Sequence, residues 1–460
     1  MPIPGENSVI RLKESRASLA HMNVLDVAVA GAADTVALVE WAYGSAVLDV
    51  AGFSLLRTSP RLHSDLFPPN WTVWNRSYVL CSADESDCGR FVIERASLAR
   101  TPDGFIVAGT AINADDNKPT MFAMRVNDAG GVMWVKRYVA KAEPPETLKP
   151  GHIVAITPMG APDRYLVAAN AELGDAWLFQ IDGNGNVTRS ARWFGLEVRQ
   201  LRTTATQILM VGAANVDTGA VALVQSLDLK TGDAAWKRAY HDTVHGPYFG
   251  WRWYDIAEAE KVLLVIGQHV AMTSEKRTMM AFLDKTNGDL YSHLEPILSD
   301  GAPVRLRSVI SRNDEGVPLT AGAVPSSFVV AGEAANKPWY FRIGEDQAVH
   351  WQKSLRTPTG EKGTFRALAW PSYDDIAAGG SIADINTPRG LVSWTSATIG
   401  RGKMNCSDQT RLTFGEPPLE AMRVGFSFDA VTITAERMQH RDGPLINFDR
   451  KCLRDQTESG

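Results

Sequence analysis

Several features that mark particular classes of protein are scarce in this sequence. Only four of its 460 residues are cysteine, and the formal net charge is −5, with Lys and Arg scattered along the chain. Such a chain has no basic field to gather the phosphates of a nucleic acid. The most apolar early stretch, residues 24–53, is interrupted by four acidic residues and cannot span a membrane. We therefore expect neither a nucleic-acid partner nor a transmembrane segment.

Sequence motifs of catalysis are also missing. The chain has no Gly-x-Ser-x-Gly nucleophile elbow, no Walker loop and no helical His-Glu-x-x-His. His241 and His245 are four residues apart, but Gly246 and Pro247 follow and disfavour a helix, so we interpret them as loop histidines rather than metal ligands. The sequence predicts no catalytic residue, no metal site and no cofactor, and it favours a protein that is not an enzyme.

A repeat is present instead. Short apolar runs that end in small residues recur along the chain, and each is followed by a second β-rich run, a turn rich in Asp, Asn and Gly, and a third run with an aromatic residue. A further strand precedes each run, so the repeating unit is four antiparallel strands. The apolar runs are "GFIVAGTA" at residue 104, "RYLVAANA" at 164, "QILMVGAA" at 207, "KVLLVIGQ" at 261, "SFVVAGEA" at 327 and "DIAAGGSI" at 375.

The period of this repeat predicts the architecture. From Gly109 to Gly379 it averages about 54 residues, which is the length of a propeller blade. We predict an all-β protein with a single β-propeller domain over residues 1–460, built from about eight four-stranded blades, although seven blades also fit. The first blade is expected at residues 22–80 and the last at 420–460.

The predicted last blade is one strand short. The segment "SVIRLKE", residues 8–14, has strand character and no partner of its own. We expect it to close the ring as an N-terminal strand beside "PLINFDR", residues 444–450, because closure removes the open edges that otherwise invite aggregation.

One copy of the repeat carries a family resemblance. In "SLDLKTGDAAWKRAY", residues 226–240, Asp228, Thr231, Gly232 and Trp236 match the tryptophan-docking repeat of pyrroloquinoline-quinone-type propellers. The resemblance implies that the Trp packs onto the neighbouring blade and that the Asp serves its turn. The repeat occurs in quinoprotein dehydrogenases and in non-catalytic envelope propellers, such as the outer-membrane assembly lipoprotein family. The dehydrogenases carry adjacent cysteines over the quinone, and this chain has none adjacent, so it resembles the non-catalytic propellers more.

Two polar stretches superficially resemble calcium loops. Residues 113–117 and 182–186 place oxygen-bearing side chains at alternate positions, as a loop that wraps a hard cation does. Neither has the later acidic ligand at the expected offset. Turn chemistry is the alternative interpretation, and it fits the second stretch, which lies at a predicted hairpin.

The most unusual local stretch is "YHDTVHGPYFGWRWYD", residues 240–255, which links one blade to the next. Its aromatic and imidazole side chains suit stacking on sugar rings or anchoring a protein interface. The alternative is that the two tryptophans fill a gap between blades. The candidate ligand-binding residues are His241, His245, Tyr248, Phe249, Trp251 and Trp253.

The cysteines indicate the cellular compartment in which the protein works. Cys81 and Cys88 flank a short loop, and Cys406 and Cys452 fall in the last two predicted blades, so two disulfides and an oxidising compartment are expected, with free buried thiols as the alternative. The first fifteen residues show no export signal. The chain is thus either cytosolic or numbered after removal of a signal peptide, and we favour a periplasmic or secreted protein.

Together these observations favour a non-catalytic binding or assembly module that presents loops to a protein or glycan partner, as part of an envelope or surface assembly. The alternative is a divergent propeller oxidoreductase or carbohydrate-active hydrolase with its site at the channel mouth. Carboxyl groups with shifted pKa values in the channel would favour the enzyme. An exposed aromatic patch over a dry, filled channel would favour binding.

Overall fold

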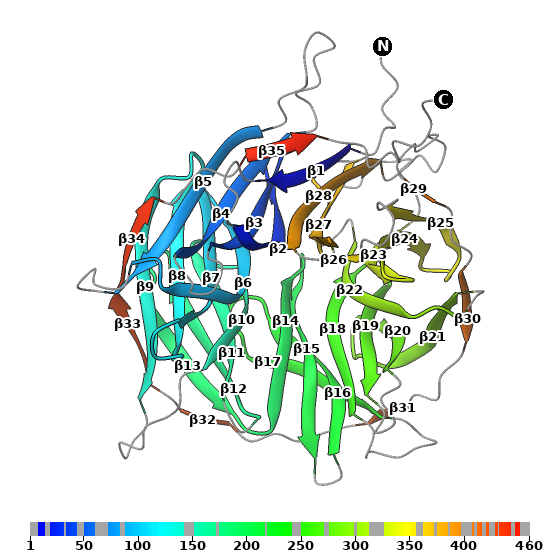
Figure 1. Cartoon of the computed structure of the whole chain (residues 1–460). Coiled ribbons are helices and arrows are strands. Elements are labelled where there is room, and N and C mark those ends of the chain that lie inside the picture. Colours follow the sequence, from blue (N-terminus) through cyan, green and yellow to red (C-terminus); the bar gives the residue numbers. More distant parts are fainter. Residues whose placement is uncertain are drawn as a thin grey trace, which may run out of the picture.

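The described part of the chain forms a ring of seven antiparallel β-sheets, each of five strands, around a central axis (Figure 1). The computed structural model describes residues 8–13, 19–31, 34–43, 50–59, 72–82, 88–141, 151–171, 174–216, 219–241, 250–270, 276–298, 301–311, 326–355, 362–371, 375–384, 387–396, 407–408, 412–415, 420–422, 428–430, 432–442 and 447–450. The described part of the chain contains no helix that is long and apolar enough to cross a membrane.

Six blades are each formed by four consecutive strands, numbered from the channel outward. Blade 1 has β2 (Leu19–Ala30), β3 (Asp34–Tyr43), β4 (Val50–Thr58) and β5 (Thr72–Cys81), and blade 2 has β6 (Phe91–Thr101), β7 (Gly104–Asn113), β8 (Pro119–Asn127) and β9 (Val132–Lys141). Blade 3 has β10 (His152–Pro158), β11 (Arg164–Asn170), β12 (Ala176–Asp182) and β13 (Val187–Trp193), and blade 4 has β14 (Leu196–Thr203), β15 (Gln207–Val216), β16 (Gly219–Asp228) and β17 (Ala234–His241). Blade 5 has β18 (Gly250–Glu258), β19 (Val262–Val270), β20 (Lys276–Asp284) and β21 (Leu290–Leu298), and blade 6 has β22 (Val304–Ser311), β23 (Ser327–Ala334), β24 (Lys337–Gly344) and β25 (Val349–Leu355).

The seventh blade combines distant parts of the chain. It has three consecutive strands, β26 (Lys362–Ala369), β27 (Asp375–Asp384) and β28 (Thr387–Ser396). On its outer side lies β1 (Ser8–Lys13), in which Ile10 pairs with Val392 of β28 and with Arg450 of β35 (Asn447–Arg450). The prediction of eight blades is therefore wrong.

The miscount has a physical cause in the last fifty residues. These have strand character, but instead of forming a blade they add one short strand to the outer edge of each sheet in turn. We call these seven strands the C-terminal belt (Figure 1). In chain order it comprises β29 (Ser407–Asp408) on blade 6, β30 (Leu412–Gly415) on blade 5, β31 (Glu420–Met422) on blade 4, β32 (Phe428–Ala430) on blade 3, β33 (Thr432–Arg437) on blade 2, β34 (Gln439–Asp442) on blade 1 and β35 on blade 7.

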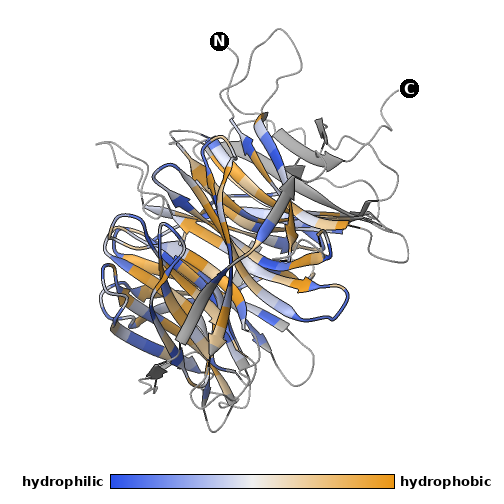
Figure 2. Ribbon diagram, turned by 90° about the vertical axis from the view of Figure 1, so that its left-hand side faces the viewer, coloured by the Kyte–Doolittle hydropathy of each residue, from blue (hydrophilic) through white to orange (hydrophobic). Residues whose placement is uncertain are grey.

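The repeated apolar runs are the second strands of the blades. Because both faces of these strands pack against neighbouring blades, the runs are buried almost throughout, as in β7 and β23. Figure 2 shows the same division, with apolar residues along the blade strands and polar residues at many of the turns.

The small residues in these runs have a specific cause. Every first strand contains a β-bulge near its middle, which pushes its backbone toward the second strand. A Cβ on Gly212 would lie 1.9 Å from the carbonyl oxygen of Glu197, and one on Gly332 would lie 1.9 Å from that of Arg305. The glycine of the apolar run therefore makes room for the bulge.

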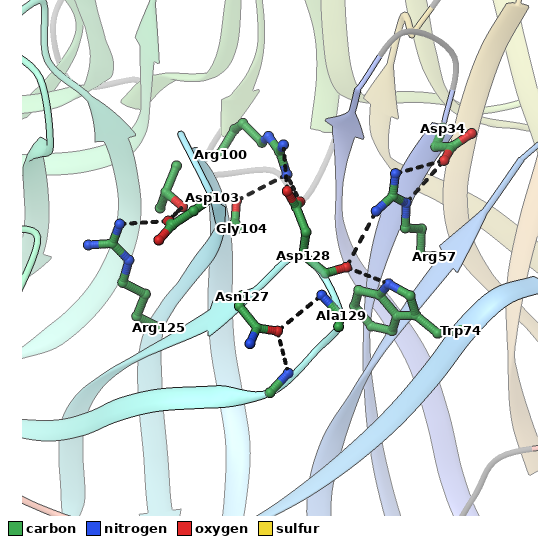
Figure 3. Close-up of polar contacts among 12 residues, drawn as sticks. Asp34, Arg57, Trp74, Arg100, Asp103, Gly104, Arg125, Asn127, Asp128 and Ala129 are labelled. Carbon is green, nitrogen blue, oxygen red and sulfur yellow. Dashed lines mark hydrogen bonds and ion pairs between the residues drawn. The ribbon is translucent and has the colours of Figure 1, made fainter.

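Aromatic side chains on the outer strands dock several of the blades onto the next blade. Trp74 donates to the carbonyl oxygen of Asp128 in the next blade at 2.8 Å (Figure 3), and Tyr78, four residues later, donates to that of Gly130 at 2.7 Å. Beside this contact Arg57 pairs with Asp34 and also donates to the Asp128 carbonyl.

The same docking recurs between blades 4 and 5. Tyr240 donates to the carbonyl oxygen of Gly288 at 2.7 Å, and the indole ring of Trp236 lies over the same glycine. Trp236 is half-buried, which is less than the burial we expect for a docking tryptophan. The carboxylate of Asp228 accepts from the backbone N–H groups of Lys230 and Thr231, so it serves its turn.

Candidate functional site in the central channel

The first strands of the blades lie around the central axis of the ring (Figure 1). Residues at their bulges, among them Arg307 and Arg366, line the cavity at this axis. A bulge leaves one extra residue without a partner on the second strand. Three of these seven residues are arginines, so the bulges concentrate positive charge. The extra residues are Leu25, Glu94, Val154, Arg199, Tyr254, Arg307 and Arg366.

A cavity of about 550 Å³ lies in the channel. It extends from the bulges to the turns at one end, where Gly31, Thr204 and Ala205 contribute to its wall. This volume matches a small ligand or a few side chains of a partner. Its charged lining consists of Arg100, Arg202, Arg307, Arg366, Asp26 and Asp255.

Asp26 joins two neighbouring blades. On β2 it accepts a hydrogen bond from the backbone N–H of Val27 at 2.8 Å. Across the blade interface it accepts from the N–H of Leu98 at 2.7 Å and from the hydroxyl of Ser97 at 3.1 Å. Burial raises the pKa of Asp26 to about 6, and these hydrogen bonds and Arg202 partly oppose the rise.

Asp255 joins blades 5 and 6 in the same way. It accepts from the N–H of Ile256, and across the interface from the N–H of Val309 and the hydroxyl of Ser308, all at 2.9–3.0 Å. Arg202 of blade 4 contacts both carboxylate oxygens, at 3.0 and 2.9 Å. The oxygens of both channel carboxylates are thus already engaged.

The arginines of the bulges lie close enough to influence one another. Burial and then the positive charge of Arg307 lower the pKa of the Arg366 guanidinium, while the nearby carboxylates of Glu40 and Glu333 raise it. Within the described residues neither Arg307 nor Arg366 has an ion pair, and both are exposed to the channel. Two adjacent blades therefore present two like charges to the same cavity.

The aromatic ring of Tyr254 lies near both Arg307 and Arg199, the arginine at the bulge of blade 4. The guanidinium carbon of Arg307 lies 5.9 Å from the ring centroid of Tyr254, and that of Arg199 lies 6.0 Å from it. Both distances are within reach of a cation–π contact. Tyr254 donates to the side-chain oxygen of Gln268 at 2.8 Å, which fixes the ring.

Glu40 is a second carboxyl group with a raised pKa. Burial raises its pKa to about 7, opposed by a hydrogen bond from Asn23 and by the charge of Arg366. Asn23 Nδ2 donates to Glu40 Oε1 at 3.0 Å. Glu40 therefore titrates near neutral pH close to Arg366.

The candidate ligand-binding residues of the segment 240–255 do not form one exposed site in the described part of the structure. Trp251 and Trp253 are buried, with 2% and 0% of their surface exposed, in the core between blades 4 and 5. Trp251 packs against His269, with ring centroids 4.3 Å apart and ring planes tilted by 45°, and Trp253 meets Tyr240 edge-on. These two tryptophans fill the gap between blades and offer a ligand almost no surface. His241 ends β17, and His245, Tyr248 and Phe249 lie outside the described residues.

Cys81 and Cys88 form a disulfide. Cys406 and Cys452 lie outside the described residues. The segment 182–186 is a turn in which the Asp182 carboxylate accepts from the N–H groups of Asn184 and Asn186, and in segment 113–117 the carboxylate of Asp115 pairs with Arg90. The described residues contain no group of three or more His, Cys, Asp or Glu placed to hold a metal ion.

Sequence reasoning missed the channel arginines. Each lies on the first strand of its blade, for example in "VRLRS", residues 304–308, or "TFRAL", residues 364–368. Arg307 lies 25 residues before Gly332 and Arg366 lies 14 residues before Gly380, the glycines that accommodate their bulges, so no constant spacing in the sequence places the two arginines at the same level of the ring.

No protein-family model matches the sequence, and no curated protein matches it. Among solved structures, hydrazine synthase from Kuenenia stuttgartiensis aligns with a TM-score of 0.48 and 10% identity, over 80% of this chain and 94% of that chain. Sqt1 from Chaetomium thermophilum aligns with a TM-score of 0.42 and 12% identity, over 84% and 100%. A variant of the sialidase NanB from Streptococcus pneumoniae aligns with a TM-score of 0.34 and 11% identity, over 86% and 56%. These structures include enzymes and also a protein solved in complex with the N-terminus of a ribosomal protein. The similarity therefore concerns architecture and identifies no function for this chain.

Proposed function

We propose that the protein is a non-catalytic recognition module that binds a protein or glycan partner at the mouth of its central channel. The observation that carries this proposal is the cavity of about 550 Å³ in the channel, whose lining combines apolar side chains with charged ones. Large concave sites of this kind are where small ligands and protruding partner groups bind.

The carboxylates of the cavity support binding over catalysis. A general acid or base needs an oxygen within hydrogen-bond reach of its substrate. The oxygens of Asp26 and Asp255 are engaged with neighbouring blades. Both residues therefore have a structural role that accounts for their position.

An enzyme remains the second candidate, because one observation favours it. Asp26 has a pKa of about 6 and Glu40 one of about 7, values that suit proton transfer near neutral pH. A glycan hydrolase or oxidoreductase would need one of them to reach a bound substrate.

Substitutions at the channel rim test the proposal. Ala205 is exposed and lines the cavity, so Ala205→Trp should narrow the mouth without disturbing the core. Ala235, exposed on β17 at the outer edge of blade 4, provides the matched control Ala235→Trp. Binding of the purified chain to a glycan array and to a panel of defined envelope proteins is measured for each variant.

We expect Ala205→Trp to weaken binding at least tenfold and Ala235→Trp to leave it unchanged. Equal binding by both variants would place the partner away from the channel. Turnover of a bound glycan that is lost in Glu40→Gln would support the enzyme.

We also propose that β1 closes the ring, that the protein belongs with the tryptophan-docking envelope propellers, and that it works in a periplasmic or secreted setting. Closure is supported by the pairing of Ile10 with both β28 and β35. Docking of Trp74 onto the next blade supports the family assignment. The bond between Cys81 and Cys88 supports an oxidising compartment.

A further inference from the structure

We propose that the channel binds its ligand through an oxyanion, a carboxylate or phosphate group, held between Arg307 and Arg366 on adjacent blades. This inference rests on the proposed function in one respect, since both place the ligand in the same cavity. It adds the chemical class of the ligand and the side chains that recognise it.

The charge balance of the cavity is the first argument. Of its four lining arginines, Arg100 pairs with Asp128 and Arg202 pairs with Asp255. Arg307 and Arg366 have no such partner within the described residues. Their mutual repulsion in a partly enclosed channel is relieved by a bound anion, and a cation would increase it.

The second argument is geometric. Arg307 and Arg366 are the extra residues of equivalent bulges on β22 and β26, so they reach the cavity at the same level from adjacent blades. Tyr254 lies beside Arg307 and restricts where its guanidinium can lie. Two planar guanidinium groups on one side of a cavity match the oxygens of a carboxylate or phosphate, which accept hydrogen bonds in pairs.

The third argument concerns size and surroundings. A volume of about 550 Å³ admits a small organic acid or one anionic group of a larger partner, but the channel is not a groove that follows a polyanion. The overall charge of −5 gives the rest of the surface no attraction for polyanions. Recognition of a discrete oxyanion therefore fits both the site and the whole chain.

Calorimetric titration of the full chain tests the inference. The probes are inorganic phosphate and citrate, in buffers matched in ionic strength with sodium chloride. The test variant is Arg307→Gln with Arg366→Gln. The control, Arg189→Gln with Arg277→Gln, removes the same charge from exposed arginines on β13 and β20, outside the channel.

We expect the wild-type chain to bind at least one of the two anions, the control to bind it equally, and the test variant to bind it at least tenfold more weakly. Preference for phosphate or citrate identifies the anionic group. If the glutamine variant does not fold, Arg307→Lys with Arg366→Lys keeps the charge without the forked donors, and it should still weaken binding.

Two outcomes overturn the inference: no binding of either anion by the wild-type chain, or equal binding by the wild-type chain and a folded variant. These outcomes are separable from failure of the proposed function. If Ala205→Trp loses partner binding and the wild-type chain binds neither anion, the proposed binding function stands and the oxyanion site is refuted. If the wild-type chain binds an anion and Ala205→Trp leaves partner binding unchanged, the oxyanion site stands and partner binding at the channel mouth is refuted.

Discussion

Substitution of Gly288 by alanine measures how tightly the blades dock. Gly288 has a φ of +75°, and a Cβ there would lie 2.5 and 2.9 Å from two ring atoms of Trp236 in the preceding blade. The backbone strain of alanine at positive φ costs about 1–2 kcal/mol. Displacing a packed indole costs about 1–3 kcal/mol more. We therefore expect Gly288→Ala to lower the free energy of unfolding by about 2–5 kcal/mol.

Gly301 supplies a matched control. Its φ is +70°, but nothing lies within 4 Å of where its Cβ would be. Gly301→Ala should therefore show the backbone cost alone, about 1–2 kcal/mol. The difference between the two variants isolates the contact with Trp236.

Urea unfolding of both variants, in the wild-type chain and in a Trp236→Ala background, gives the required free energies. Because Trp236 is half-buried, its own truncation should cost about 2 kcal/mol, below the range for a fully buried aromatic residue. In that background the extra cost of Gly288→Ala should disappear. Equal costs at the two glycines, or an extra cost that persists without the indole, would refute the docking argument.

Three further predictions concern closure, thiols and pH. Deleting residues 1–15 should lower the melting temperature sharply, since it removes the strand between β28 and β35, and unchanged stability would contradict a closing role. Mass spectrometry of the unreduced protein should find no free thiol among its four cysteines, whereas four alkylatable thiols would indicate a reducing compartment. The pKa of Glu40 is raised in the folded chain from 4.5 to about 7, so its contribution to stability is full below pH 4.5 and lost as the pH rises through 7. Relative to wild type, Glu40→Gln should gain about 2–3 kcal/mol in the free energy of unfolding between pH 4.5 and 8, and parallel pH profiles would argue against this titration.

The propeller could be predicted from sequence because its second strands are buried on both faces. Runs such as that of β7 are apolar throughout, and the glycine in most of them is required by the bulge beside it. The blade count failed because short edge strands and blade strands have the same local composition. Only their pairing, which joins residues far apart in the chain, distinguishes β33 from a strand of a blade.

The channel site was harder to predict for a related reason. Arg307 and Arg366 are separated by 59 positions in the chain and meet only because their bulges occupy equivalent places in adjacent blades. The segment 240–255 drew attention through its aromatic content. In the folded chain, however, the pattern of Trp251 and Trp253 reflects a strand that packs between blades.

The C-terminal belt determines the order in which the outer edges of the sheets are completed during synthesis of the chain. A ribosome releases β2 to β25 early, and each of blades 1 to 6 can assemble as its four strands emerge. The belt then follows the ring from blade 6 back to blade 1 and reaches blade 7 last, where β35 pairs with β1. β1, which is made before the other described strands, therefore acquires its final partner only when residues 447–450 have been made. Until its belt strand has been made, each sheet presents an open edge of the kind that pairs with other chains, so the interval before the belt is complete is when a nascent chain most needs a chaperone.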